Sequence, residues 1–85
     1  MNLMTDKNYV SGLKSNMHAC FDSPSGKEVM QFLEQTGCWY KSVWEPGNPE
    51  MTLINDGKRQ VVATIKTILE CSPDQIVSLV QQKES

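Results

Sequence analysis

Three prolines, each preceded by Ser or Asn, divide this chain into helical segments. The pairs are Ser23-Pro24, Asn48-Pro49 and Ser72-Pro73. A Ser or Asn side chain accepts hydrogen bonds from the free amides of a helix's first turn. Proline is favoured at the first helical position because no amide donor is needed there. Each pair therefore predicts the start of a helix.

Apolar residues at helical spacing follow each of these starts and also precede the first one. We expect helices over about residues 5–20 and over residues 49–70. A further helix is expected from Pro24 until Gly37 ends that helix, and another from Pro73 onward, where Ser72 and Gln75 form a capping box. A loop over 38–48, with a turn at its Pro-Gly pair, joins the second and third helices. The predicted fold is all-α: one domain over residues 1–85, a small bundle of three to four helices with an aromatic-rich loop between the second and third.

The helical spacing also predicts which side chains form the core, because residues on one face of a helix recur every three or four positions. Gly57, at the edge of the third face, is expected to allow close approach of another helix. Lys14 and His18 are expected to point into solvent. The predicted core residues are Tyr9, Val10, Leu13, Met17 and Cys20; Val29, Met30, Phe32 and Leu33; Met51, Ile54, Val61, Val62, Ile65, Ile68 and Leu69; and Ile76, Val77, Leu79 and Val80.

Composition and charge exclude several functional classes. Hydrophobic residues make up 39% of the chain and charged residues 21%, which is typical of a soluble globular protein. The small acidic net charge of −2 gives no general attraction to nucleic acid, so a nucleic-acid partner is not expected. No apolar run approaches the ~20 residues that span a bilayer, and the N-terminal residues lack the pattern of a signal peptide. We therefore expect a cytoplasmic location and no membrane association.

No catalytic or metal-binding constellation is recognisable in the sequence. Cys20, Cys38 and Cys71 are widely spaced and, with His18 as the single histidine, do not match a zinc site. We expect all three thiols to be reduced and structural, with Cys38 the most exposed. The segment 23–27 lacks the second glycine and the preceding strand of a phosphate-binding loop. The sequence therefore predicts no enzyme, with no catalytic residue, metal or cofactor.

The loop before the third helix holds the first candidate binding residues. Trp39, Tyr40 and Trp44 place three large aromatic side chains within a six-residue segment. Two interpretations remain open: the aromatics fold back and cap a small core, with Trp44 favoured for that role, or they anchor a protein partner.

The basic pair of the third helix supplies the remaining candidates. Lys58 projects near the middle of the apolar face, where a charge must reach solvent, pair with a carboxylate or meet a partner. Asp22 and Glu28 are the carboxylates expected to be within reach. Arg59 and Lys66 are expected on the polar side of the helix, and Arg59 joins Lys58 among the predicted partner-binding residues.

Three motifs carry a resemblance to a known family. An aromatic residue precedes a Ser-Pro-x-Gly-Lys helix start within 21–27, the aromatic loop ends in a Pro-Gly-x-Pro turn at 46–49, and a Gly-Lys-Arg run at 57–59 leads into apolar residues. Over about residues 21–70 the chain resembles the small Bbp-nineteen-like protein family of tailed bacteriophages. The resemblance implies a phage setting among virion-assembly proteins and no assigned activity.

Two functions fit these observations. The first is a non-enzymatic bacteriophage accessory protein that acts through protein–protein contacts in virion structure or assembly, located in the host cell cytoplasm or incorporated in the virion. Its partner would be a phage structural component. The alternative is a phage-encoded inhibitor that binds a host enzyme or defence complex. The broad apolar face of the third helix also predicts a possible homodimer with a two-fold contact.

Overall fold

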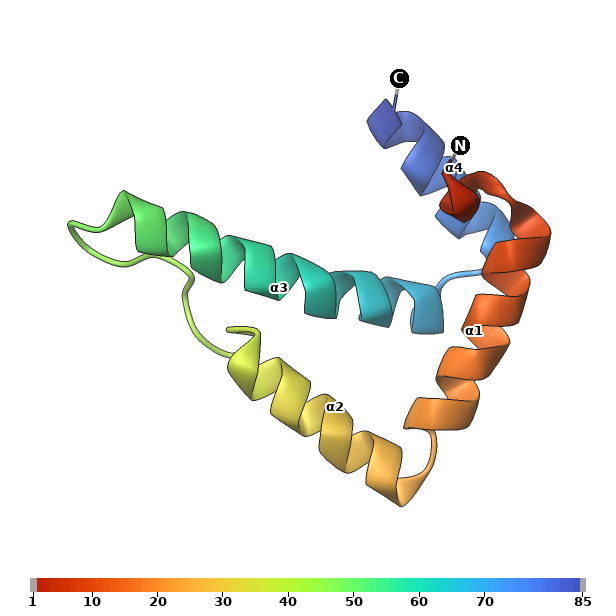
Figure 1. Cartoon of the computed structure of the whole chain (residues 1–85), viewed down its shortest axis with the longest axis horizontal. Coiled ribbons are helices and arrows are strands. Elements are labelled where there is room, and N and C mark those ends of the chain that lie inside the picture. The colour runs from red at the N-terminus through yellow and green to blue at the C-terminus, as the bar shows by residue number, and fades with distance from the viewer. Residues whose placement is uncertain (1, 85) are drawn as a thin grey trace.

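The computed structural model describes residues 2–84, in which a short 3₁₀ turn at Leu3–Thr5 is followed by four α-helices. They are α1 (Lys7–Phe21), α2 (Pro24–Thr36), α3 (Pro49–Glu70) and α4 (Pro73–Glu84). No strand occurs in this part of the chain, which confirms the predicted all-α fold. In Figure 1, α1, α2 and α3 form the sides of an open triangle, and α4 leaves from the corner where α1 and α3 meet.

The three predicted helix starts are all confirmed by their capping bonds. The side chains of Ser23 and Asn48 each accept a hydrogen bond of 3.0 Å from the backbone amide three residues later. Ser72 and Gln75 form the reciprocal bonds of a capping box, because the Gln75 amide donates to Ser72 Oγ at 3.2 Å and the Ser72 amide donates to Gln75 Oε1 at 2.9 Å. Local side-chain chemistry therefore fixes where α2, α3 and α4 begin.

The first helix begins later than its apolar spacing predicted. Asp6 Oδ1 accepts hydrogen bonds from the amides of Asn8 at 2.9 Å and Tyr9 at 3.3 Å, so Asp6 is the N-cap. Thr5 belongs to the preceding 3₁₀ turn instead. The carboxylate cap sets the helix start at Lys7.

The hydrophobic core lies at one corner of the triangle. Val10 of α1, Ile68 of α3 and Ile76 of α4 are buried against one another there. Partly buried residues surround them: Met4, Leu13, Met17, Cys71 and Val77. All of α2 and the N-terminal half of α3 lie away from this corner (Figure 1).

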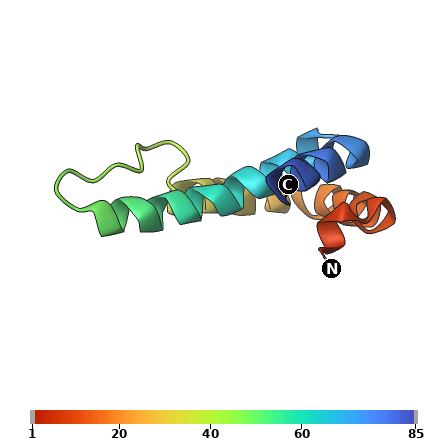
Figure 2. The same cartoon turned by 90° about the horizontal axis from the view of Figure 1, so that it is seen from above.

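Away from the core corner the molecule is a single layer of helices, whereas at that corner α4 lies over α1 (Figure 2). The principal extents of the molecule are 44 × 38 × 17 Å, so the smallest is less than half of either of the others. Figure 2 shows this thin profile. The radius of gyration is 14.7 Å, against about 12 Å for a compact domain of this length. Domains usually bury their apolar faces between two packed layers, so this layer leaves apolar surface uncovered.

The predicted apolar faces are therefore wrong in part. In a single layer, a helix is covered only where a neighbouring helix lies beside it. Side chains that point above or below the layer therefore remain exposed. Cys20 is exposed as well, whereas Cys38, which was expected to be the most exposed thiol, is half-buried. The predicted core residues that are exposed instead are Tyr9, Cys20, Val29, Phe32, Met51, Ile54, Val61 and Leu79.

Close helix approach occurs at glycines other than the predicted one. Gly57 is exposed, and an added Cβ would meet no heavy atom within 4 Å, so the prediction for this residue is wrong. At Gly26 a Cβ would overlap the backbone of the last turn of α1. At Gly37 it would overlap the Val62 side chain of α3. These two glycines set the sharp bend between α1 and α2 and the contact between α2 and α3.

Candidate protein-interaction surface

Trp39 anchors the start of the loop between α2 and α3. Its indole ring is half-buried, with Lys66 Nζ at 4.7 Å and the Arg59 guanidinium at 5.2 Å from the ring centre. Its backbone amide donates to the Glu34 carbonyl at 2.9 Å. Cations over an indole face are attracted by the negative π surface. The expected polar-side position of Lys66 is wrong, because this side chain lies partly buried between α2 and α3.

Glu34 joins this tryptophan contact to Tyr40. The Glu34 side chain is only 9% exposed, and its Oε2 accepts from Lys66 Nζ at 2.8 Å and from the Tyr40 hydroxyl at 3.1 Å. The hydrogen bond from Lys66 lowers the pKa of Glu34 and outweighs the opposing effect of burial. Donation to the Glu34 carboxylate raises the pKa of Tyr40. We name Glu34, Trp39, Tyr40, Arg59 and Lys66 the loop clasp.

The rest of the loop runs beside the N-terminal half of α3 (Figure 2). Asn55 Nδ2 donates to the Val43 carbonyl at 3.2 Å, and the Glu45 amide donates to Thr52 Oγ1 at 2.9 Å. The predicted Pro-Gly turn is confirmed, with φ +74° at Gly47. These bonds place the end of the loop against the first two turns of α3.

Trp44 and Leu53 lie exposed where this loop meets α3. The two residues are 65% and 73% exposed. Both line a shallow groove of about 330 Å³, which we name the tip groove; its other lining residues are Glu45, Gly47, Asn48, Pro49 and Thr52. The favoured prediction that Trp44 caps the core is therefore wrong. Tyr40, although hydrogen-bonded in the loop clasp, is also exposed.

Lys58 occupies an exposed position on α3, apart from the loop clasp. Ile54 and Val61, one turn away on either side, are exposed too. No ion pair joins Lys58 to a carboxylate within residues 2–84, so of the three alternatives for this residue the pairing with Asp22 or Glu28 does not occur. Of the five predicted binding residues, the structure brings together Trp39, Tyr40 and Arg59, and leaves Trp44 and Lys58 separately exposed.

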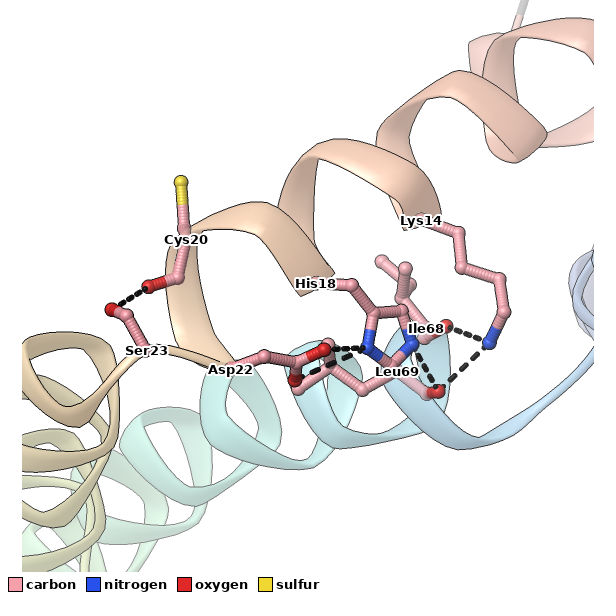
Figure 3. Close-up of polar contacts among 7 residues, drawn as sticks. All are labelled: Lys14, His18, Cys20, Asp22, Ser23, Ile68 and Leu69. Carbon is pink, nitrogen blue, oxygen red and sulfur yellow. Dashed lines mark hydrogen bonds and ion pairs between the residues drawn. The ribbon is translucent and has the colours of Figure 1, made fainter.

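A junction of α1 and α3, drawn in Figure 3, was missed by the sequence analysis. Lys14 Nζ donates to the carbonyls of Ile68 and Leu69 at 3.1 and 2.8 Å. His18 lies within 3.0 Å of the Leu69 carbonyl through Nε2 and of the Asp22 carboxylate through Nδ1. Both side chains were predicted to point into solvent, and both predictions are wrong. They satisfy carbonyls that the end of α3 leaves without helical partners.

The ring geometry defines what His18 can do. A backbone carbonyl and a carboxylate are both acceptors, so both contacts are hydrogen bonds only when both ring nitrogens carry a proton. The neutral ring donates to one of them. The imidazole joins α1 to α3 in the doubly protonated state and in the neutral tautomer that donates to the Leu69 carbonyl.

A second groove, of about 260 Å³, separates α3 from α4. Its lining is mainly apolar or uncharged and includes Met4, Thr64, Ile76, Leu79 and Lys83. Within residues 2–84, no group of three or more His, Cys, Asp or Glu side chains is placed to hold a metal ion. In the same part of the chain, no helix is long and apolar enough to cross a membrane.

Over the residues that the structure describes, the fold and its surface define a small all-α protein with an exposed aromatic tip. The chain belongs to the family described as Bbp19-like phage protein, whose model matches residues 17–81. The match confirms the resemblance and extends beyond the predicted 21–70 to include most of α4 and the end of α1. No curated protein and no solved structure shows significant similarity to the chain.

Proposed function

We propose that this phage protein is a non-enzymatic accessory factor that acts through protein–protein contacts in virion structure or assembly. The observation that carries the proposal is the tip groove, where Trp44 and Leu53 are exposed although the loop around them is held by hydrogen bonds. Exposed aromatic anchors on a fixed backbone are the residues from which protein interfaces gain most of their binding energy. Such a protein acts in the host cell cytoplasm, where particles assemble, and a tightly bound copy stays in the virion.

The chemistry of the side chains favours contact over catalysis. Nucleophilic catalysis requires a base beside the nucleophile. His18 is engaged with Asp22 and the Leu69 carbonyl, and Glu34 is engaged with Lys66 and Tyr40. The two groups best suited to proton transfer therefore already hold the fold together.

The test uses phage that carry Trp44→Ala. We expect the purified variant to keep its melting temperature, because the side chain is exposed, and to disappear from purified particles and assembly intermediates analysed by mass spectrometry. Phe32→Ala is the matched control: this aromatic side chain is similarly exposed, at 63%, but lies on α2 outside the tip groove. Absence of the wild-type protein from both particles and intermediates would contradict the proposal.

A further inference from the structure

One stripe of α3 has the spacing of a helix–helix seam, yet no helix formed by residues 2–84 lies beside it. Met51, Ile54, Lys58 and Val61 follow one another at intervals of three, four and three residues. This is the a/d pattern of a coiled coil, in which alternating intervals keep the side chains on one line along the helix. We name these four residues the α3 seam.

The structure leaves the α3 seam uncovered. Met51, Ile54 and Val61 are 40%, 54% and 61% exposed, and Lys58 is exposed between them. Gly37, at the end of α2, is packed against the Val62 side chain, and the part of α3 before this point projects past the end of α2 (Figure 1). The loop occupies another side of this projecting part, through Thr52 and Asn55. The seam is thus open to an approaching helix.

The accessible surface of the chain is larger than that of a compact monomer by about the area that one protein interface buries on each partner. The accessible surface is 6130 Å², whereas a compact folded monomer of 9.6 kDa exposes about 5,100 Å². The excess is about 1,000 Å², and a stable protein interface buries about 800 Å² on each partner. A second copy carries an equal excess, and a two-fold contact through the seam would bury the same surface on each copy.

Lys58 determines which arrangement of two copies is acceptable. In a parallel pair, equivalent positions face each other, so the two Lys58 ammonium groups would meet inside the seam. In an antiparallel pair each Lys58 lies opposite Ile54 of the other copy, and Met51 lies opposite Val61. The lysine methylenes then cover the isoleucine while the ammonium reaches solvent.

We infer that the α3 seam is the interface of an antiparallel homodimer. This inference goes beyond the proposed function, because it concerns the purified chain and does not depend on particle association. The tip groove takes no part in the interface and remains free for a different partner.

Sedimentation at micromolar concentrations tests the dimer. We expect the wild-type chain to sediment at twice the 9.6 kDa mass of one chain. Ile54→Lys should be monomeric yet folded by circular dichroism, because the residue is exposed in the monomer and the new ammonium would meet Lys58 of the other copy. Leu53→Lys is the matched control, a neighbouring and more exposed apolar residue outside the seam, and it should remain dimeric.

The direction of the two helices is tested by Ile54→Glu. In the antiparallel dimer the new carboxylate faces Lys58 of the other copy, so this variant should retain association that Ile54→Lys loses. In a parallel dimer residue 54 faces itself, and both changes would place like charges together. Equal loss of association in the two variants would refute the antiparallel arrangement, and a wild-type chain that sediments only as a monomer would refute the dimer.

Discussion

The Glu34 carboxylate connects the end of α2 to both α3 and the loop, so its charge should contribute to stability. Its pKa in the folded state is below the ordinary value of 4.5 because Lys66 donates to it. A lowered folded-state pKa stabilises the fold above the ordinary pKa, and this contribution is lost as the pH falls through the lowered value. We expect Glu34→Gln to reduce the free energy of unfolding by about 1–2 kcal/mol at neutral pH.

The pH dependence separates this effect from a general loss of packing. The stability gap between wild type and Glu34→Gln, measured by urea denaturation, should narrow as the pH is lowered below the ordinary carboxyl value. Glu28→Gln, which changes an exposed carboxylate on the same helix, should alter stability by less than about 0.5 kcal/mol. A gap that stays constant into the acid range would contradict the assigned role of the Glu34 charge.

His18 should be a stabilising residue and not a functional one. His18→Ala removes the contacts with Asp22 and the Leu69 carbonyl, while Lys14 continues to donate to that carbonyl. The expected loss is therefore about 1 kcal/mol in the free energy of unfolding, measured in urea, with particle association retained. Asn16→Ala, at an exposed position of the same helix, is the control. Unchanged stability in His18→Ala would show that the His18 contacts drawn in Figure 3 contribute nothing to stability.

At the scale of the helices, Gly26 sets the bend between α1 and α2. A methyl group there would overlap the backbone of the last turn of α1, so Gly26→Ala should force the two helices apart and lower the melting temperature strongly. Gly12→Ala is the opposite case, because a Cβ at this position in α1 would meet nothing within 4 Å. We expect Gly12→Ala to stabilise by about 0.5–1 kcal/mol. Similar melting temperatures for the two variants would contradict this account.

The two tryptophans of the loop should behave differently. Trp39→Ala removes the half-buried ring from between Arg59 and Lys66 and should cost about 2 kcal/mol, less than the full cost of truncating a buried aromatic residue. Trp44→Ala should change the free energy of unfolding by less than about 0.5 kcal/mol. Chemical denaturation of the two variants measures both values. A larger loss in Trp44→Ala would mean that this side chain belongs to the fold.

Local signals made the starts of the helices predictable from the sequence. The arrangement of these helices in an open layer was not predictable in this way. The Ser23-Pro24, Asn48-Pro49 and Ser72-Pro73 pairs act within one helical turn, so their consequences can be read from neighbouring residues. The exposure of Ile54 and Val61 depends on whether another helix lies above the layer, and helical spacing alone cannot settle that.

The same distinction between local and long-range signals applies to the candidate binding residues. The sequence identified the aromatic loop but could not assign separate environments to Trp39 and Trp44. Those depend on the contact of Trp39 with Lys66, across 27 positions of the chain, and on the Gly37 contact that brings α2 to α3. The structural role of Lys14 and His18 was not predicted. Their acceptors are backbone carbonyls at the end of α3, and because every residue has a backbone carbonyl, the sequence does not identify which of them accept.

At the scale of the whole molecule, Lys58 should limit the strength of self-association. Lys58→Met keeps the length of the side chain and removes a charge from the α3 seam, so it should lower the dimer dissociation constant. Its melting temperature should match wild type in dilute solution and exceed it at high concentration, because association stabilises by mass action. Scanning calorimetry at several concentrations measures this difference. Weaker association of Lys58→Met would contradict the position of Lys58 in the interface.

The thinness of the layer has a consequence for how stability varies with temperature. The heat capacity of unfolding rises with the apolar area that the folded state removes from water, and an ordinary domain of 85 residues would show about 1.0–1.3 kcal/mol/K. A layer 17 Å thick with a core at one corner removes less, so the dilute chain should fall below this range. A smaller heat capacity change flattens the stability curve. The free energy of unfolding of the isolated chain should therefore be modest and should change little between cold and warm conditions.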